Sequence, residues 1–339
     1  MTARQPAHSA KPAPAINHLS YAEAIAQGLA QAMELSREVV LIGQLIDYSP
    51  GVFGTTTGLA ERFGTDRVLD FPVAESVMTA AGMGAALAGM RPVLIHHRLD
   101  FMLYSMDALV NWISLWRFKS NGESSVPLTI RAIIGKGWGQ GPQHSKSLHA
   151  WFAHLPGLKV AMPATAFDAK GLLLESIFGE DPVMIIEHRS LFGLKDRVPE
   201  VPYRVRFGKA AVRRPGKDIT VVAAGVMVPF ALRVAAQLAS QGMEPEVIDL
   251  RTVSPLDSET VCASVEKTGR LAVLDPTWAS FGMAAEVIAR VAERHGRRLR
   301  ADPVRITHPD SHTPMSSALE AAYYPDEEEV TRKLRALMA

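Results

Sequence analysis

Glu75 is the residue whose type and position most directly suggest chemistry. It follows a short apolar run over residues 68–74 and begins a segment dominated by Ala, Gly and Met, which predicts a closely packed helix that sees little water. A carboxylate at the start of such a helix is either an ordinary N-terminal acid, stabilised by the helix dipole, or a partly desolvated group that can exchange a proton with a ligand. The residue type alone favours the ordinary interpretation, so the surrounding sequence has to decide.

His144 is the second candidate. It lies just after a glycine-rich segment over residues 135–141, which follows a predicted buried strand and lacks the Gly-Lys-Ser/Thr ending of a phosphate loop. Loops after the carboxyl ends of parallel strands often line binding sites, and imidazole titrates near neutral pH, as acid–base chemistry requires. A lone histidine is more often structural than catalytic, so the hypothesis depends on this loop position.

Several other chemistries are excluded. Cys262 is the single cysteine, so there is no disulfide framework and no cysteine cluster for zinc. His96 and His97 are adjacent and would alternate faces on a strand, which does not favour a zinc site. No Gly-x-Ser-x-Gly motif marks a nucleophile. The glycines at 82–89 lack the spacing of a dinucleotide fingerprint and lie inside a helical pattern.

Composition and charge define the broad class of protein. The chain has 339 residues, 47% hydrophobic and 21% charged, which is typical of a globular protein. With 36 basic and 35 acidic residues the net charge is +1, so no nucleic-acid partner is expected. No apolar run approaches the roughly 18 residues of a membrane span, and one cysteine fits a reducing cytoplasm. Residues 1–18, rich in Pro and Ala without an apolar core, are expected to form a mobile arm and not a secretory signal. The alternative is that this segment lies along a partner subunit.

Short apolar runs alternate with amphipathic segments along the rest of the chain, which predicts an α/β protein with parallel sheets covered on both faces. The predicted strands are Val39–Ile42, Val93–Ile95, Leu128–Ile134, Leu158–Met162, Val183–Ile186, Ile219–Ala224, Glu246–Leu250, Leu271–Leu274 and Val304–Ile306. The predicted helices are Tyr21–Leu35, Glu75–Met90, Met106–Arg117, Phe167–Phe178, Pro229–Gln241, Glu259–Lys267 and Ala284–Arg294, with a short aromatic-rich helix at Leu148–Phe152.

The segment Gly193–Lys217 divides this pattern in two. It contains Pro199, Pro202 and Pro215, mixed charges and no helical period, as expected of a connection between domains. We therefore predict two doubly wound α/β domains, at residues 19–205 and 206–339.

Taken together, the motifs resemble a known family. They include Arg-Val-x-Asp-x-Pro-x-x-Glu over residues 67–75, Gly-Met-Arg-Pro-Val over 89–93, Asp100-Phe101, Gln-His-Ser over 143–145, Pro-Gly-Leu-Lys-Val over 156–160, and Asp-Leu-Arg-Thr over 249–252. The sequence resembles the β subunits of the thiamin-diphosphate-dependent decarboxylating component of 2-oxo acid dehydrogenase complexes of the pyruvate, branched-chain or acetoin type. The resemblance implies a transketolase-like pyrimidine-binding domain followed by a transketolase C-terminal-like domain.

The resemblance also implies roles for individual residues. Glu75 matches the glutamate that hydrogen-bonds the aminopyrimidine ring of the cofactor and favours the imino tautomer, which abstracts the thiazolium proton. Phe101 matches an aromatic ring that packs on the pyrimidine, and His144 matches a histidine that contacts substrate or the lipoyl acceptor. Further positions expected to bind the cofactor are Leu99, His97 and Gln44. A structural potassium ion is implied at Leu128, Ser176, Ile177, Gly179 and Asp181, mostly through backbone carbonyls.

One motif of the superfamily is absent. The Gly-Asp-Gly segment that holds Mg²⁺ and the cofactor diphosphate does not occur in this chain. The resemblance therefore implies a separate α subunit that carries this segment, an active site at the subunit interface, and an α₂β₂ heterotetramer with a β–β contact. A lipoyl acyltransferase core is a further implied partner, although residues 313–316 depart from the family's Pro-x-Pro-Tyr segment, which would change docking.

Departures from the family keep two alternatives open. Gln44 replaces a usual acid associated with proton exchange between paired sites. His96, His97 and Arg98 replace apolar or small residues, which adds positive or polar character near the pocket. That character would suit the β half of a split transketolase or acyloin-forming enzyme, which transfers its acyl or two-carbon unit to an aldehyde. The other alternative is a catalytically silent scaffold for an α subunit, against which the joint presence of Glu75, Phe101 and His144 argues.

Overall fold

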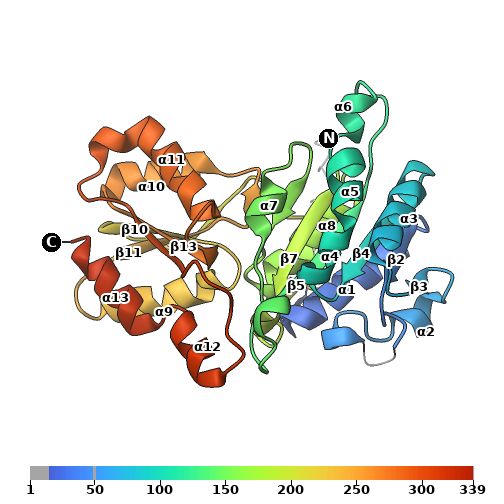
Figure 1. Ribbon diagram of the computed structural model, residues 1–339, viewed down its shortest axis with the longest axis horizontal. Coiled ribbons are helices and arrows are strands. Elements are labelled where there is room, and N and C mark those ends of the chain that lie inside the picture. The colour runs from blue at the N-terminus through green and yellow to red at the C-terminus, as the bar shows by residue number, and fades with distance from the viewer. Residues whose placement is uncertain (1–14, 49–50, 339) are drawn as a thin grey trace, which may run out of the picture.

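The computed structural model describes residues 15–48 and 51–338 and forms two α/β domains side by side (Figure 1). The first domain is built on a seven-stranded sheet with the order β12-β6-β7-β5-β4-β2-β3. Six of its strands are parallel: β2 Val39–Gly43, β3 Val68–Asp70, β4 Arg91–His96, β5 Thr129–Ile134, β6 Lys159–Ala161 and β7 Val183–His188. Residues on both faces of the central strands are buried, as expected of a parallel sheet between helical layers.

Two helical layers cover this sheet. One face packs against α1 (Tyr21–Leu35) and α8 (Ala166–Ile177), with α2 (Leu59–Phe63) beside them. The other face packs against α3 (Glu75–Leu87), α4 (Leu99–Met102), α5 (Met106–Ala108), α6 (Trp116–Lys119) and α7 (His149–Ala153). Successive residues of β2 show the alternation, because Leu41 belongs to the first layer's core and Ile42 to the second.

The second domain has a five-stranded sheet with the order β14-β13-β10-β11-β9. Its strands are β9 Ala211–Arg214, β10 Ile219–Ala223, β11 Pro245–Asp249, β13 Leu271–Trp278 and β14 Val304–His308, all parallel except β9. Helices α9 (Met227–Ala239) and α13 (Glu327–Ala336) cover one face, and α10 (Ser258–Thr268) and α11 (Met283–His295) cover the other (Figure 1). Helix α12 (Ser317–Tyr323) lies near the first domain. The predicted fold class is confirmed, and every predicted strand corresponds to an observed one.

Some segments differ from the sequence-based expectations. Residues Ile16–Ser20 form β1, which pairs antiparallel with β8 (Lys195–Pro199), so residues 16–18 belong to a sheet and not to the expected arm. The remainder of that arm, up to residue 14, lies outside the described residues. Strands β8 and β9 also occupy the segment expected to be a plain connection. Both exist because distant strands supply their hydrogen bonds, which a local pattern cannot reveal.

The domains share one sheet. Strand β12 (Thr252–Ser254) comes from the C-terminal half of the chain yet pairs antiparallel with β6 of the first domain. The helix expected at Met106–Arg117 is also broken, because a π-helical turn over Leu109–Ile113 separates α5 from α6. Among the described residues, no helix has the length and apolar character needed to cross a lipid bilayer.

Candidate active site

Glu75 is the first residue of α3 and follows a short loop over residues 71–74 after β3. Its backbone carbonyl accepts a hydrogen bond of 2.9 Å from Ser105 Oγ, and Thr79 Oγ1 donates to the same hydroxyl over 2.8 Å. The side chain is half-buried, and among the described residues its carboxylate has no hydrogen-bond or ion-pair partner. The carboxylate therefore neither caps the helix nor forms an ion pair within the described residues, and it is available to a ligand.

The helix that carries Glu75 is less buried than its composition predicts. One side of α3 packs into the core through Met78, Gly82 and Met83, but the opposite side is exposed. We define the α3 face as Val73, Ser76, Val77, Ala80, Ala81, Gly84 and Leu87, all exposed. The expectation that this helix sees little water is wrong for the single chain. An exposed face of small and apolar residues is typical of a protein interface.

Phe101 and His144 lie against each other. Phe101 is on α4, and its ring centroid is 5.1 Å from that of His144 with an interplanar angle of 79°. Asp100 links the segment of Phe101 to the loop of His144. Its Oδ1 accepts hydrogen bonds from the Lys146 backbone N at 3.2 Å and from Lys146 Nζ at 3.4 Å. Ser105 follows in the same segment, and its hydroxyl donates to the backbone carbonyl of Glu75. The structure thus brings together the elements that carry all three predicted residues.

Buried polar atoms without hydrogen-bond partners occur on the segments that carry these residues. In the described part of the chain they include Gln44 Nε2, both ring nitrogens of His97 and His144 Nδ1, with others on His96, Arg98 and Asp100. Arg98 Nε and Asp100 Oδ2 form an ion pair at 3.8 Å. Buried polar groups in folded proteins are nearly always hydrogen-bonded. Such a concentration is typical of a site that binds a polar ligand, which fits a cofactor with a hydrogen-bonding ring.

The electrostatics of the neighbouring histidines correct an expectation. Burial lowers the pKa of His96 to about 3, and burial followed by Arg131 lowers the pKa of His97 to about 4. Both rings are therefore neutral at pH 7 and do not add positive charge. The cation here is Arg98, whose Nη2 donates to the Gly135 carbonyl at 2.7 Å.

Two further predicted positions differ in their access to a ligand. Gln44 is half-buried directly after β2, and its amide nitrogen has no partner among the described residues. The Leu99 side chain is fully buried in the core. Any contact between Leu99 and a bound molecule would therefore be made by its backbone.

The oxygens of the predicted potassium site already accept hydrogen bonds. Arg91 Nη1 donates to the carbonyls of Ile177 and Gly179, at 3.1 and 2.8 Å. The Leu128 carbonyl accepts from Val183 N, and the Ser176 carbonyl accepts from Gly179 N. The Asp181 carboxylate pairs with Arg117 and Lys159, each at 2.8 Å. These residues would fit a potassium ion only by sharing their oxygens with internal donors, and the site stays a prediction. No cluster of three His, Cys, Asp or Glu side chains suited to a metal occurs among residues 15–48 and 51–338.

Sequence reasoning missed a buried ion pair beneath the site. Arg131 on β5 and Glu187 on β7 form a bidentate pair, with Nε–Oε1 and Nη2–Oε2 distances of 2.6 and 2.8 Å, and both side chains are almost completely buried. The available signal was a charged residue inside each of two otherwise apolar strands. Such residues are rarely buried unless they are paired.

Comparisons with known proteins agree with this architecture. Residues 17–195 match the family model for the transketolase pyrimidine binding domain, and residues 208–330 match that for the transketolase C-terminal domain. A solved structure described as a split gene transketolase, in an inactive β4 tetramer, superposes with a TM-score of 0.77 over 95% of this chain and 99% of that chain, at 21% identity. At this identity the likeness shows the fold alone. The two domains define a protein of the transketolase class.

Curated relatives narrow the class. The β subunit of acetoin:2,6-dichlorophenolindophenol oxidoreductase from Cupriavidus necator is 39% identical over 94% of this chain and 97% of that protein. The β subunit of the pyruvate dehydrogenase E1 component from Bacillus subtilis is 38% identical over 93% of this chain and 97% of that protein. The chain belongs to the transketolase family, in the group formed by the β subunits of pyruvate dehydrogenase E1 and of acetoin oxidoreductase.

Proposed function

We propose that this chain is the β subunit of a thiamin-diphosphate-dependent 2-oxo acid dehydrogenase. The enzyme decarboxylates a 2-oxo acid and passes the acyl group to lipoamide, and this chain supplies the pyrimidine half of the active site. The observation that carries the proposal is a Glu75 carboxylate without a partner among the described residues, on a helix that Ser105 bonds to the segment after Phe101. Phe101 in turn packs on His144, and buried polar atoms on the same segments lack hydrogen-bond partners. A site shared between two chains requires polar groups of this kind, which one chain alone leaves without partners. We place the enzyme in the cytoplasm, which the single buried Cys262 supports.

Each residue has a role in this proposal. Thiamin diphosphate, when bound, supplies the nucleophilic carbon and the electron sink that decarboxylation of a 2-oxo acid needs. With the cofactor bound, Glu75 would share a proton with the aminopyrimidine ring and Phe101 would pack on that ring. Gln44 and His97 would contact it with polar atoms that lack hydrogen-bond partners in the described chain. His144 contacts the substrate or the acyl acceptor and moves a proton there.

The other half of the site belongs to a second chain. The sequence has no Gly-Asp-Gly segment for the metal and diphosphate, so an α subunit has to carry Mg²⁺ and the phosphate end. The α3 face supports such a partner, since Val73 and Val77 are 81% and 58% exposed. We infer an α₂β₂ heterotetramer with a β–β contact. Binding of a lipoyl acyltransferase core is a further part of the proposal.

The aldehyde-transferring alternative is less well supported. A split transketolase or acyloin-forming enzyme would gain from cationic groups near the acceptor. His96 and His97 are neutral. The charge of Arg98 is balanced by Asp100, at 3.8 Å, and its Nη2 donates to the Gly135 carbonyl. A direct comparison of lipoamide with aldehydes as acceptors, in the reconstituted complex, distinguishes the two functions. A silent scaffold predicts that the reconstituted complex does not bind thiamin diphosphate.

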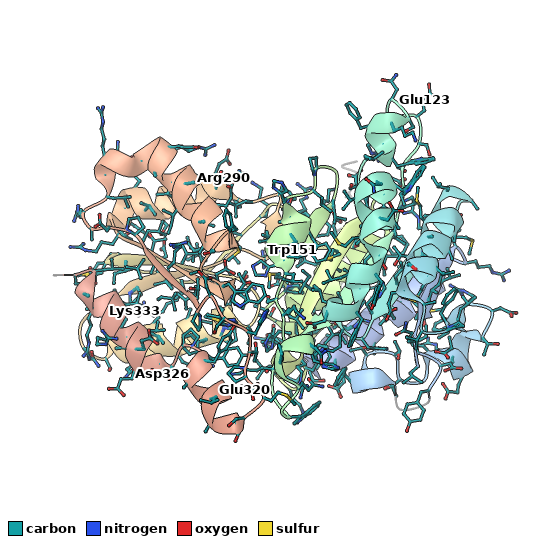
Figure 2. The ribbon with its side chains drawn as sticks, viewed as in Figure 1. Glu123, Trp151, Arg290, Glu320, Asp326 and Lys333 are labelled. Carbon is teal, nitrogen blue, oxygen red and sulfur yellow. The ribbon has the colours of Figure 1, made fainter. Side chains whose placement is uncertain are left out.

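The decisive experiment is Glu75→Gln in the complex reconstituted with its α subunit. Exchange of the thiazolium proton of bound cofactor with solvent deuterium, followed by NMR, reports the role of the carboxylate directly. We expect slowing by about 10²-fold or more, with unchanged circular dichroism. Glu123→Gln is the matched control, because Glu123 is exposed at the far tip of the first domain (Figure 2). Near-normal exchange and turnover in Glu75→Gln would refute the role.

A further inference from the structure

A cavity of about 390 Å³ lies between the two domains, apart from the candidate active site. Its first wall is formed at the carboxyl ends of β5 and β7, and its second wall at the carboxyl ends of β10, β13 and β14. Glu75, Phe101 and His144 do not line it. Crevices at the carboxyl ends of parallel strands are the usual ligand sites of α/β proteins.

The polar part of the cavity is suited to an anion. Its charged lining side chains are Lys136 and Arg233, and none of the described lining residues is acidic. Lys136 Nζ lies 3.7 Å from the ring centroid of Tyr324. Two acids lie nearby. Glu320 on α12 accepts from the Gly137 backbone N at 2.9 Å (Figure 2 shows Glu320). Glu327 pairs with Arg233 at 2.6 Å, so Lys136 is the lining cation that has no ion pair among the described residues.

Two more groups on the first-domain wall can donate to a ligand. His188 Nδ1 accepts from Ser190 N at 3.2 Å, which leaves the proton of the neutral ring on Nε2. The pKa of His188 is lowered to about 3, first by burial and then by Lys136, so the ring is neutral at pH 7. Ser145 is more than nine-tenths buried and lines the cavity, and its Oγ has no partner among the described residues.

The rest of the cavity is apolar. Val226, Met227, Pro229 and Phe230 line it from the first turn of α9, and Leu191 lines it from the first domain. The amino end of α9 also directs its partial positive charge to this wall. The chemistry therefore divides into one end for an anionic group and another for a hydrocarbon portion.

We propose that this interdomain cavity binds a small organic anion, in which a carboxylate or phosphate group meets Lys136, Ser145 and His188 and an apolar body packs on α9. The site is linked to the candidate active site through the chain itself. Ser145 follows His144, and Lys146 bonds to Asp100, which precedes Phe101. An occupant held by Ser145 fixes this loop, and thereby the position of His144. Binding here does not depend on the reaction proposed above.

Calorimetric titration of the full chain at constant ionic strength tests the site. The probes are sodium hexanoate, inorganic phosphate and, as the uncharged match to hexanoate, hexanamide. We expect saturable binding of hexanoate and none of hexanamide. Saturable binding of phosphate without hexanoate identifies a phosphoryl site and also supports the proposal. If neither anion binds saturably to the unmodified chain, the proposal fails.

Variants locate the binding. Lys136→Met and Ser145→Ala each remove one donor to the anion, and we expect affinity to fall by about tenfold or more, as loss of a charge-assisted hydrogen bond predicts. Lys217→Met is the matched control, because Lys217 is exposed before β10, at the opposite end of that strand. Unchanged affinity in both Lys136→Met and Ser145→Ala would overturn the site. If Lys136→Met fails to fold, Ser145→Ala alone decides.

Hydrogen–deuterium exchange tests the link to the active site. Saturating hexanoate, or phosphate if only phosphate binds, should slow exchange of peptides that cover residues 135–147, and this protection should be lost in Ser145→Ala. Binding without any change in these peptides would overturn the proposed coupling.

Discussion

His149 and Asp275 meet across the boundary between the two domains, with His149 Nε2 2.8 Å from Asp275 Oδ1. Both side chains are fully buried. Ser147 Oγ lies 3.0 Å from the other ring nitrogen of His149, and Asp275 Oδ2 accepts from the backbone N of Ala284 on α11. This network joins the loop that carries His144 to the second domain. Trp151, on α7 of the first domain, lies at the same boundary (Figure 2).

Removal of this imidazole should destabilise the protein. His149→Phe leaves a buried carboxylate oxygen without its partner, which costs about 2–3 kcal/mol in the free energy of unfolding. Guanidinium denaturation followed by circular dichroism measures the change. His154→Phe, exposed just beyond the end of the same helix, is the control and should behave like the unmodified chain. Equal midpoints for the two variants would show that the contact carries no net stability.

His144→Ala should separate the two half-reactions. An imidazole that moves a proton during acyl transfer contributes about 10²-fold or more to that step, so reductive acylation of lipoamide should slow more than decarboxylation. Single-turnover measurements on the reconstituted complex resolve the steps, with His154→Ala as control. Equal slowing of both steps would assign His144 a positioning role against Phe101.

The sequence was sufficient to predict the parts of the molecule that depend on local pattern. Runs such as Val39–Ile42 are continuous and apolar because they are buried on both faces, and they became parallel strands. The place of Glu75 at a helix start was equally visible. Features created by distant partners were not predictable, such as the pairing of β1 with β8. The neutral state of His97 was not predictable either. Its pKa is lowered by burial and by Arg131, and neither effect is evident in the local sequence.

Stability should decrease as the pH is lowered, in part because of His96. Its pKa in the folded protein is about 3, mainly through burial, whereas an unfolded histidine has a pKa of about 6.5. Between these values the unfolded chain binds more protons, so the free energy of unfolding falls as pH falls and levels off above about pH 6.5. From pH 7 to pH 5 this group accounts for about 2 kcal/mol.

The variant His96→Leu removes that contribution. Denaturation of His96→Leu is measured at pH 7 and at pH 5. Between these two values its free energy of unfolding should fall less than that of the unmodified chain, by about this amount. His154→Leu serves as the exposed-histidine control. An identical loss in His96→Leu and in the unmodified chain would mean that the ring is not held neutral by the fold.

The α3 face should be required for assembly and not for folding. Ala80 is exposed on α3, and arginine forms helices nearly as well as alanine, so Ala80→Arg costs about 0.2 kcal/mol of helix propensity. A bulky charge on a face of small residues would prevent close packing of a partner and leave a cation desolvated. We therefore expect Ala80→Arg to keep the thermal midpoint of the single chain and to lose heterotetramer formation with the α subunit, as measured by light scattering after gel filtration.

Ala236→Arg, on an exposed position of α9 in the second domain, is the matched control and should assemble normally. Normal assembly of Ala80→Arg would show that the α3 face stays open to solvent in the complex, and the partner that completes the Glu75 site would then have to approach from another side.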